Sequence, residues 1–328
     1  MTRYLISSVL TGFLLVAFGC RPTPLPKSPA FAAIDLQALN AENALAEARA
    51  LVVFSPREAG TPGARAAAGH LLKRLQTIGI QASLEAFTDD TPAGPTTFWN
   101  VMGTIPAAGG KSAAADWIFL GSHFDTKSGI SPGFQGANDS ASSSGLLLEL
   151  ARVLQAAGPL RLNIGIAFFD GEECRRNYAA NDGLHGSSQA ARALVLNRKA
   201  GKVRAVIILD MVGDKDLSIT IPRNCTPDLA ARAFRAAEEE KVRDKFALMA
   251  GALLDDHVPF LEAGLPAVDL IDFEFGSLPG KNDYWHTAQD TLDKLSAESL
   301  GITGRVVLRM LNDLMQEAQA ERKLGQRR

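Results

Sequence analysis

The sequence predicts a single α/β domain with a mostly parallel, mixed central sheet and helices on both faces. Apolar segments of strand length alternate with longer amphipathic segments over much of the chain, a pattern typical of parallel strands joined by helices. These strands are apolar throughout, which indicates that both faces of the sheet are covered. The chain has 328 residues, 46% of them hydrophobic, enough for one large core.

The first part of the chain predicts two helices followed by three strands. One helix is expected over 39–54, with Asn40 as its N-cap. The second is expected over 61–79, because it opens on Thr-Pro and closes at a glycine. The strands that follow are expected over 80–87, which alternates as an exposed strand does, 97–106 and 116–125.

Helices and strands then alternate as far as the C-terminal region. The helices are expected over 141–158, 187–200, 227–241, 256–264 and 296–319. The strands among them are expected over 162–170, 203–213 and 266–273. In open sheets of this kind, ligands bind beyond the carboxyl ends of the strands.

The N-terminal segment predicts export. Residues 1–20 hold Arg3, an apolar run and the pair Gly19-Cys20, which matches a signal peptide and is too short for a membrane span. Cys20 after Gly19 resembles a bacterial lipoprotein signal, in which the cysteine carries the lipid. We therefore expect a periplasmic protein, or one anchored to the membrane by that lipid alone. Residues 21–38 are expected to be a proline-rich tether, and 39–328 the functional domain.

The composition of the chain indicates which classes of binding partner to expect. The net charge is −2, and the chain has no basic stripe or arginine-rich segment, so no nucleic-acid partner is expected. Besides Cys20 the chain has Cys174 and Cys225. An oxidising compartment permits a disulfide between them. In the alternative, Cys174 is a small apolar residue beside the site and Cys225 is a free thiol in a loop. The sequence does not give the distance between the two cysteines, so both the bridged and the unbridged interpretation stay open.

Polar residues gather where the predicted strands end. The segment IGIAFFDGEEC, 164–174, runs from an apolar strand directly into three carboxylates, those of Asp170, Glu172 and Glu173. Other polar residues stand at comparable places, namely His123, Asp125, Asp210 and, at the start of a helix, Asp139. Because the carboxyl ends of parallel strands share one edge of the sheet, these side chains are expected to meet there.

These residue types suit zinc. A catalytic zinc ion takes imidazole nitrogen and carboxylate oxygen and keeps one position open. None of the five histidines forms an H-E-x-x-H motif, so the ligands must come from distant segments. We expect His123 to bind metal, oriented by Asp125, rather than to fill the core. We also expect Asp139 to be a ligand rather than a helix N-cap, and His286 to be a third.

Glu172 and Glu173 are expected to divide two tasks. Adjacent carboxylates at the end of an apolar strand repel one another unless a cation is present. One can bind the metal while the other acts as general base, and Asp170 supports the turn. Asp210 lies in an apolar run, where an unpaired carboxylate is costly to bury. Two of the remaining histidines, His70 and His185, are expected to be structural. His257 is expected either to be structural or to support the metal ligands.

The motifs GSHFDT, GANDSASSSG, FFDGEE, LDMVG and YWHT occur in this order, and as a set they resemble the zinc aminopeptidase superfamily of exported bacterial enzymes. Vertebrate glutaminyl cyclases share that fold. The resemblance extends from about Ser55 to the C-terminus. In the aminopeptidase pattern it implies two zinc ions that share Asp139, with His123 and Asp210 on one ion, and Glu173 and His286 on the other.

In the cyclase pattern the resemblance implies one zinc ion. Its ligands would be Asp139, Glu173 and His286. Glu172 would shuttle a proton in this pattern, whereas in the aminopeptidase pattern the same residue would be the general base that activates water. Asp210 and Asp255 would form a hydrogen-bonded pair beside it, Asp255 would position the substrate amine, and Trp285 would line the pocket.

Several stretches favour the cyclases over the aminopeptidases. They are the long segment 174–187 after the glutamate pair, the stretch 255–271, and Trp285 directly before His286. The sequence also departs from the cyclases at Tyr178, where they carry a pocket tryptophan, at Leu254, and at an insertion over 274–283. Tyr178 is therefore expected to line the substrate pocket.

The resemblance implies a zinc-dependent glutaminyl-peptide cyclotransferase that converts the N-terminal glutamine of peptides to pyroglutamate. The alternative is a zinc aminopeptidase acting on peptide N-termini, with two zinc ions instead of one. A third reading, from another class, is a binding domain that has lost catalysis. The ligand set and Glu172 are intact in the sequence, which favours the enzymes.

Overall fold

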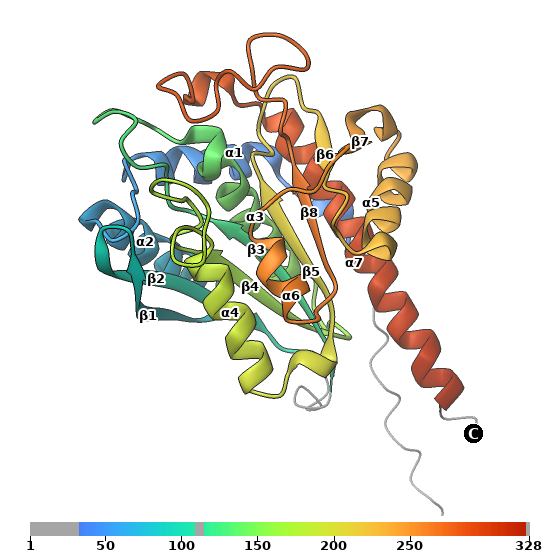
Figure 1. The fold of residues 1–328 in the computed structure, drawn as a ribbon. Coiled ribbons are helices and arrows are strands. Elements are labelled where there is room, and N and C mark those ends of the chain that lie inside the picture. The colour runs from blue at the N-terminus through green and yellow to red at the C-terminus, as the bar shows by residue number, and fades with distance from the viewer. Residues whose placement is uncertain (1–32, 109–114, 326–328) are drawn as a thin grey trace, which may run out of the picture. The chain divides into compact units, whose positions relative to one another are not determined.

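A mixed sheet of eight strands lies at the centre of the fold (Figure 1). The computed structural model describes residues 33–108 and 115–325. The strand order is β1-β2-β4-β3-β5-β8-β6-β7. The strands cover Gln81–Thr91 (β1), Gly94–Ile105 (β2), Trp117–His123 (β3), Asn163–Phe169 (β4), Val203–Asp210 (β5), Ile219–Ile221 (β6), Phe246–Leu248 (β7) and Ala267–Ile271 (β8).

The middle of the sheet is parallel and its edges are mixed. Strands β4, β3, β5 and β8 run in one direction. Strand β2 joins β4 antiparallel and forms a long hairpin with β1. At the other edge, β6 is antiparallel to β8 and parallel to β7. The predicted fold class, a mostly parallel mixed sheet in an α/β domain, is confirmed.

Helices cover both faces of the sheet (Figure 1). One face carries α1 (Ala41–Val52), α2 (Pro62–Ile78), α3 (Ser143–Ala156), α5 (Pro227–Glu239) and α7 (Ala297–Gly325), and the other carries α4 (His185–Leu196) and α6 (His257–Glu262). Each face has its own hydrophobic core. In β4, Ile166 and Phe168 belong to the core on the first face, whereas Ala167 and Phe169 belong to the core on the second. This alternation explains why the strand is apolar throughout.

The first two helices begin and end where their capping residues predict. The Asn40 side chain accepts from the Asn43 amide at the start of α1, as N-cap residues do. Thr61 caps α2, with Pro62 as its first residue. Gly79 ends α2 with φ +90°, a left-handed conformation that favours glycine.

Some elements differ from the sequence prediction. Strands β6 and β7 have three residues each, too few for a recognisable hydrophobic pattern, and they were missed. Helix α7 continues to Gly325, past the predicted end at 319. Helix α4 begins at His185, two residues earlier than predicted. A π-helical turn, Ala137–Ser142, precedes α3.

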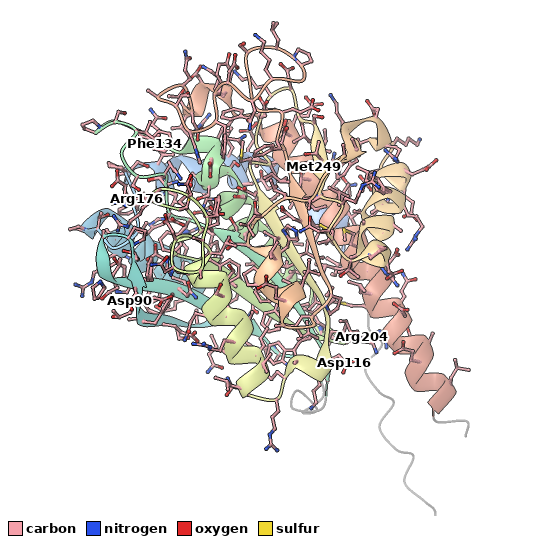
Figure 2. All side chains as sticks on the ribbon, viewed as in Figure 1. Asp90, Asp116, Phe134, Arg176, Arg204 and Met249 are labelled. Carbon is pink, nitrogen blue, oxygen red and sulfur yellow. The ribbon has the colours of Figure 1, made fainter. Side chains whose placement is uncertain are left out.

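The two ends of the parallel strands differ in chemistry. At the amino end, Arg204 near the start of β5 donates to Asp116, just before β3, at 2.7 Å (Figure 2). Both side chains are partly exposed there. At the carboxyl end, by contrast, His123 and Asp210 are the last residues of β3 and β5 and are buried. The predicted site residues therefore lie at the end of the sheet where ligands are expected.

The predicted signal peptide 1–20 lies outside the described residues, as does most of the predicted tether 21–38. The first described residues pack on the domain. Ile34 is buried in the larger core, and its amide donates to Asn312 Oδ1 at 2.7 Å. In the part of the chain that the structure describes, no helix is both long and apolar enough to cross a membrane.

Cys174 and Cys225 are both buried and both free. The structure therefore agrees with the interpretation in which Cys174 and Cys225 do not form a disulfide. The Cys225 thiol accepts from the Asp269 amide at 3.3 Å, and burial raises the pKa of this thiol.

Close packing of α1 against α3 depends on Gly145. A Cβ at this position would lie 2.6 Å from both the Ala44 carbonyl oxygen and the Ala48 amide nitrogen. Because these are backbone atoms, the helices would have to move apart. We expect Gly145→Ala to lower the free energy of unfolding by about 1–3 kcal/mol, measured by urea denaturation.

Gly69 offers the matched control for this substitution. It lies in α2 with no atom within 4 Å of its added Cβ. Gly69→Ala is expected to stabilise the protein by up to about 1 kcal/mol, because alanine favours the helix. Equal stability of the two variants would contradict the packing argument.

Candidate active site

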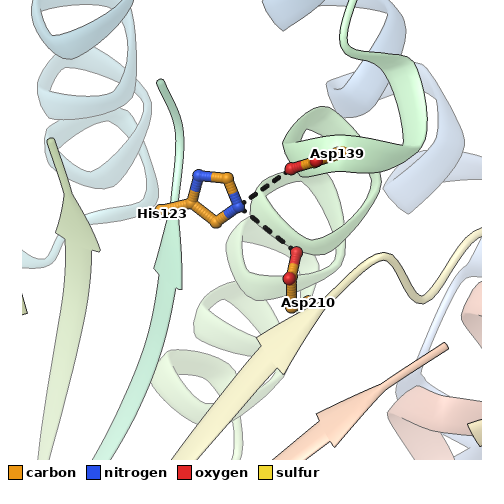
Figure 3. A group of neighbouring side chains, drawn as sticks. All are labelled: His123, Asp139 and Asp210. Carbon is orange, nitrogen blue, oxygen red and sulfur yellow. Dashed lines mark hydrogen bonds and ion pairs between the residues drawn. The ribbon is translucent and has the colours of Figure 1, made fainter. Parts of the chain in front are cut away.

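Two histidines approach the same aspartate from opposite sides. His123 Nε2, at the end of β3, lies 3.1 Å from Asp139 Oδ1 and 3.3 Å from Asp210 Oδ1 (Figure 3). His286 Nε2 lies 3.3 Å from Asp139 Oδ2 and 2.9 Å from Glu173 Oε1. Each oxygen of Asp139 thus faces a different histidine.

These side chains form two potential metal sites that share Asp139. One group is His123, Asp139 and Asp210, and the other is Asp139, Glu173 and His286, with the ligand atoms of each group within 4.8 Å of one another. Imidazole nitrogens and carboxylate oxygens are ligands that zinc prefers. Glu173 Oε2 is buried without a hydrogen bond, and the Lys127 ammonium lies 3.5 Å from it. The donor set therefore fits zinc in either group.

The turn that carries Asp139 is held by two buried residues that the sequence interpretation missed. Asp290 accepts from the amides of Asn138 and Asp139 at 2.7 and 3.1 Å. The guanidinium of Arg57, which is fully buried, donates to the carbonyl oxygen of Gly136 at 2.9 Å. Asp139 itself departs from helical geometry. Its side chain points into the site, so it is not the helix N-cap that was considered as the alternative.

Asp125 connects the ends of two strands. Its carboxylate accepts from the amides of Glu172 and Glu173, each at 3.2 Å. Its Oδ1 also lies 3.4 Å from His123 Nδ1. This contact leaves Nε2 of His123 facing Asp139 and Asp210, the arrangement expected of a carboxylate that orients a metal-binding histidine.

The backbone of His286 adopts a strained conformation. Its φ is +55°, a left-handed conformation that is uncommon for non-glycine residues and often marks functional positions. The Trp285 ring stacks on the His286 imidazole with centroids 3.8 Å apart. Phe273 packs against the edge of Trp285. These contacts hold the imidazole toward Asp139 and Glu173.

The charges of the site depend on one another. Burial raises the pKa of Asp139, but the hydrogen bonds with His123 and His286 outweigh it, and the pKa falls below its usual range. Burial lowers the pKa of His286, yet Asp139 and Glu173 bring it up to about 9. Burial and Asp139 raise the pKa of Glu173 to about 7. The carboxylates therefore require a positive partner, which is a proton or a cation.

Glu172 faces the same space without joining either metal group. Burial raises the pKa of Glu172 well above the usual range. The nearby His123 lowers this pKa, whereas carboxylates such as Glu173 raise it further. A carboxyl group with a raised pKa can take up and return a proton near neutral pH. The Tyr178 hydroxyl donates to Glu172 Oε1 at 2.8 Å.

A cavity of about 160 Å³ opens onto these groups. Its walls include apolar side chains and the acidic residues of the site: Asp139, Glu172, Tyr178, Asp210, Leu253, Leu254, Asp255, Ile271, Phe273, Trp285 and His286. A larger cavity of about 390 Å³, lined in part by residues of α4, contains none of the candidate metal ligands.

Behind Asp210 lies a second buried group of ionisable residues. Asp255 lines the cavity together with Asp210, and burial with nearby carboxylates raises the pKa of Asp255 well above its usual range. Ligand atoms of Asp255, His257 and Asp269 lie within 4.8 Å of one another. Burial lowers the pKa of His257 to about 4, and burial together with Asp210 raises that of Asp269 well above its usual range. At neutral pH His257 is therefore uncharged.

The other residues considered from the sequence lie elsewhere. His70 packs on Phe54 with ring centroids 5.1 Å apart. His185 stacks on Phe98, and its Nδ1 lies 2.9 Å from Asp89 Oδ2. Asp170 accepts from the Trp99 amide at 2.8 Å, which joins the end of β4 to β2. None of His70, His185 and Asp170 belongs to the potential metal groups found among the described residues.

Lys127 is a further residue that the sequence interpretation missed. Its ammonium group lies 3.5 Å from Glu173 Oε2 and donates to the Cys174 carbonyl oxygen. The signal was present in the sequence, because Lys127 follows His123 by four positions in SHFDTK. A lysine at the end of a strand is, however, usually solvated.

Comparison with protein families identifies the chain. The model of peptidase family M28 matches residues 100–311. The chain belongs to this family. The match covers the segments that carry the glutamate pair and every potential metal ligand, and it confirms the resemblance inferred from the motifs.

The proteins that this chain resembles include glutaminyl cyclases and an exopeptidase. A glutaminyl-peptide cyclotransferase-like protein from Bos taurus is 29% identical over 78% of this chain and 71% of the relative. The crystal structure of an Acidobacteriales bacterium glutaminyl cyclase superimposes with a TM-score of 0.76 and 32% identity, covering 90% of this chain and 99% of the other. A Zn-dependent exopeptidase from Parabacteroides distasonis, 24% identical, shares the fold with a TM-score of 0.73 over 86% and 99% of the two chains. The prediction of a glutaminyl cyclase-like enzyme is confirmed, and the aminopeptidase alternative has support from the family alone.

The raised pKa of Asp269 predicts a pH-dependent cost to stability. The folded protein retains a proton on this carboxyl that the unfolded chain loses above pH of about 4, so this residue lowers stability as pH rises. Asn cannot lose that proton. We expect Asp269→Asn to be more stable relative to the wild type at pH 8 than at pH 5.5, measured by thermal unfolding.

Asp244→Asn is the control for this prediction, because Asp244 is exposed in a short 3-10 helix. Its unfolding curves should follow those of the wild type at both pH values. A stability difference for Asp269→Asn that does not change with pH would show that Asp269 is charged in the folded protein.

Proposed function

We propose that this M28 enzyme is a zinc-dependent glutaminyl-peptide cyclotransferase. It would convert an N-terminal glutamine of a peptide or protein to pyroglutamate with release of ammonia. The ligands of the metal would be Asp139, Glu173 and His286. When bound, zinc supplies a Lewis acid that polarises the γ-carboxamide of the substrate.

The chain's own residues account for the remaining steps. The substrate's α-amino nitrogen forms a bond to its γ-carboxamide carbon, and the bond from that carbon to the amide nitrogen breaks. Glu172 accepts a proton from the attacking amine and returns it to the leaving nitrogen, which departs as ammonia. Asp255 orients the amine, and Trp285 closes one wall of the cavity. Because the attack is intramolecular, holding the side chain in place favours the reaction.

The similarity to a glutaminyl cyclase, with 32% identity over 90% of this chain and 99% of that structure, carries the choice of the cyclase reading. Asp210 and Asp255 both line the cavity. Burial and the carboxylates around Asp255, that of Asp210 among them, raise the pKa of Asp255 well above its usual range. The aminopeptidase alternative has its own support, since His123, Asp139 and Asp210 form the second potential metal group.

We expect the purified protein to form pyroglutamate from a glutamine-initiated peptide, with about one zinc ion per chain. Mass spectrometry detects the loss of ammonia, and metal analysis of the same sample counts the zinc. Release of free amino acids from amino-acid p-nitroanilides with about two zinc ions per chain would instead establish the aminopeptidase.

Glu172→Gln is the matched variant in that assay. It removes the proton carrier while keeping the size of the side chain, so kcat is expected to fall about a hundredfold or more at unchanged zinc content. Loss of zinc in this variant would mean that Glu172 is a ligand and that its assigned role is wrong.

We also propose that residues 1–20 direct export, that Cys20 carries a lipid, that 21–38 tether the enzyme, and that 39–328 form its catalytic domain. The sequence of residues 1–20 supports this. The full-length protein expressed in a bacterial host should fractionate with membranes, and Cys20→Ser should move it to the soluble fraction. An equal distribution of both proteins would argue against the lipid.

A further inference from the structure

We infer that Tyr178 is a positioning residue for Glu172: its hydroxyl fixes one carboxylate oxygen so that the other is presented to the substrate. The inference rests on the proposed function, in which Glu172 moves the proton. Its basis is the 2.8 Å hydrogen bond from the Tyr178 hydroxyl to Glu172 Oε1. Lining the pocket, the role expected from the sequence, requires only the ring.

The segment that carries Tyr178 is built around one carboxylate. We call residues 174–184 the Tyr178 loop. The Asp182 carboxylate accepts from three consecutive amides near the start of this loop, those of Arg175, Arg176 and Asn177. Arg176 marks the loop in Figure 2. Ala179 and Asp182 also exchange two backbone hydrogen bonds of 3.1 Å. The tip of the loop, where Tyr178 lies, is thus closed on itself.

The loop is attached to the turn that carries Glu172. The Leu184 amide donates to the Glu172 carbonyl oxygen, and the His185 amide donates to that of Gly171, both at 2.9 Å. The Arg175 guanidinium holds the outer side of the loop through the Ala59 carbonyl oxygen at 2.9 Å. The end of the loop therefore returns to the residue whose side chain Tyr178 contacts.

Gly183 leaves space for the Tyr178 ring. A Cβ at this position would lie 2.6 Å from Cδ1 of the ring and 2.9 Å from the Glu172 carbonyl oxygen. Its φ of +94° is also a conformation that side chains rarely adopt. The ring consequently rests against the backbone of Gly183, which directs its hydroxyl toward Glu172.

The chemistry of the contact suits positioning. Burial and nearby carboxylates, foremost that of Glu172, raise the pKa of the Tyr178 phenol, so the phenol keeps its proton and acts as a donor. Among the described residues, Tyr178 supplies the one side-chain hydrogen bond that Glu172 receives. Without it the carboxylate could rotate. With it, one oxygen is fixed and the other is left for the substrate amine, a restriction that favours proton transfer.

Tyr178→Phe tests the inference because it removes the hydroxyl and keeps the ring. We expect kcat for a glutamine-initiated peptide to fall about tenfold to a hundredfold, the usual effect of a hydrogen bond to a charged group. KM, zinc content and melting temperature are expected to stay unchanged. Tyr284→Phe is the matched control: no hydrogen bond to the Tyr284 hydroxyl is found among the described residues, and its kinetics should match the wild type.

The outcomes separate this inference from the proposed function. Unchanged kcat in Tyr178→Phe, or a raised KM alone, would overturn the positioning role and leave Tyr178 as a pocket wall. If the wild type releases amino acids instead of forming pyroglutamate, the proposed function fails, and the same comparison of kcat with KM on p-nitroanilides decides the role of Tyr178. A wild type that turns over neither substrate would overturn both.

Discussion

The carboxylate of Asp125 is the interaction on which the site depends. Asp125 lies just beyond β3. Its carboxylate accepts hydrogen bonds from the backbone amides of Glu172 and Glu173, which follow β4, and it contacts Nδ1 of His123. One side chain thereby fixes the position of His123 relative to that of Glu172 and Glu173. Because the carboxylate is fully buried, no water competes for these contacts, and the geometry is determined by the protein alone.

Burial of so many acidic groups at one edge of the sheet requires compensation, and the fold supplies it in layers. Nearest the cavity, two imidazoles flank Asp139. Farther out, the Arg57 guanidinium interacts with Asp290, Asp125 and Asp139, and the Lys127 ammonium lies 3.5 Å from Glu173. Behind Asp210, burial and the Asp210 carboxylate raise the pKa of Asp269 well above its usual range, which favours its uncharged form. The buried acidic groups are therefore balanced by positive groups and by protonation.

The sequence revealed the parts of the site that stand at the ends of long apolar strands. His123, the glutamate pair and Asp210 were recognisable because a charged residue after such a strand is exceptional. Arg57 and Asp290 were not, since each lies in a loop and its partners are backbone groups distant in sequence. The same limit applies to β6 and β7, whose three residues carry no periodicity. For Tyr178 the sequence indicated a place in the pocket wall, but only the structure shows that its hydroxyl points to Glu172.

The site draws on the ends of separate strands and on a turn close to the last helix, so its ligands are far apart along the chain. Bringing them together closes long loops, which costs conformational entropy before any ligand bond can form. The closely spaced ligands of a zinc finger belong to one short segment, whereas each candidate group here is complete only when separate strands have been brought to the same edge of the sheet. The donor atoms are therefore held together by the packing of the whole domain.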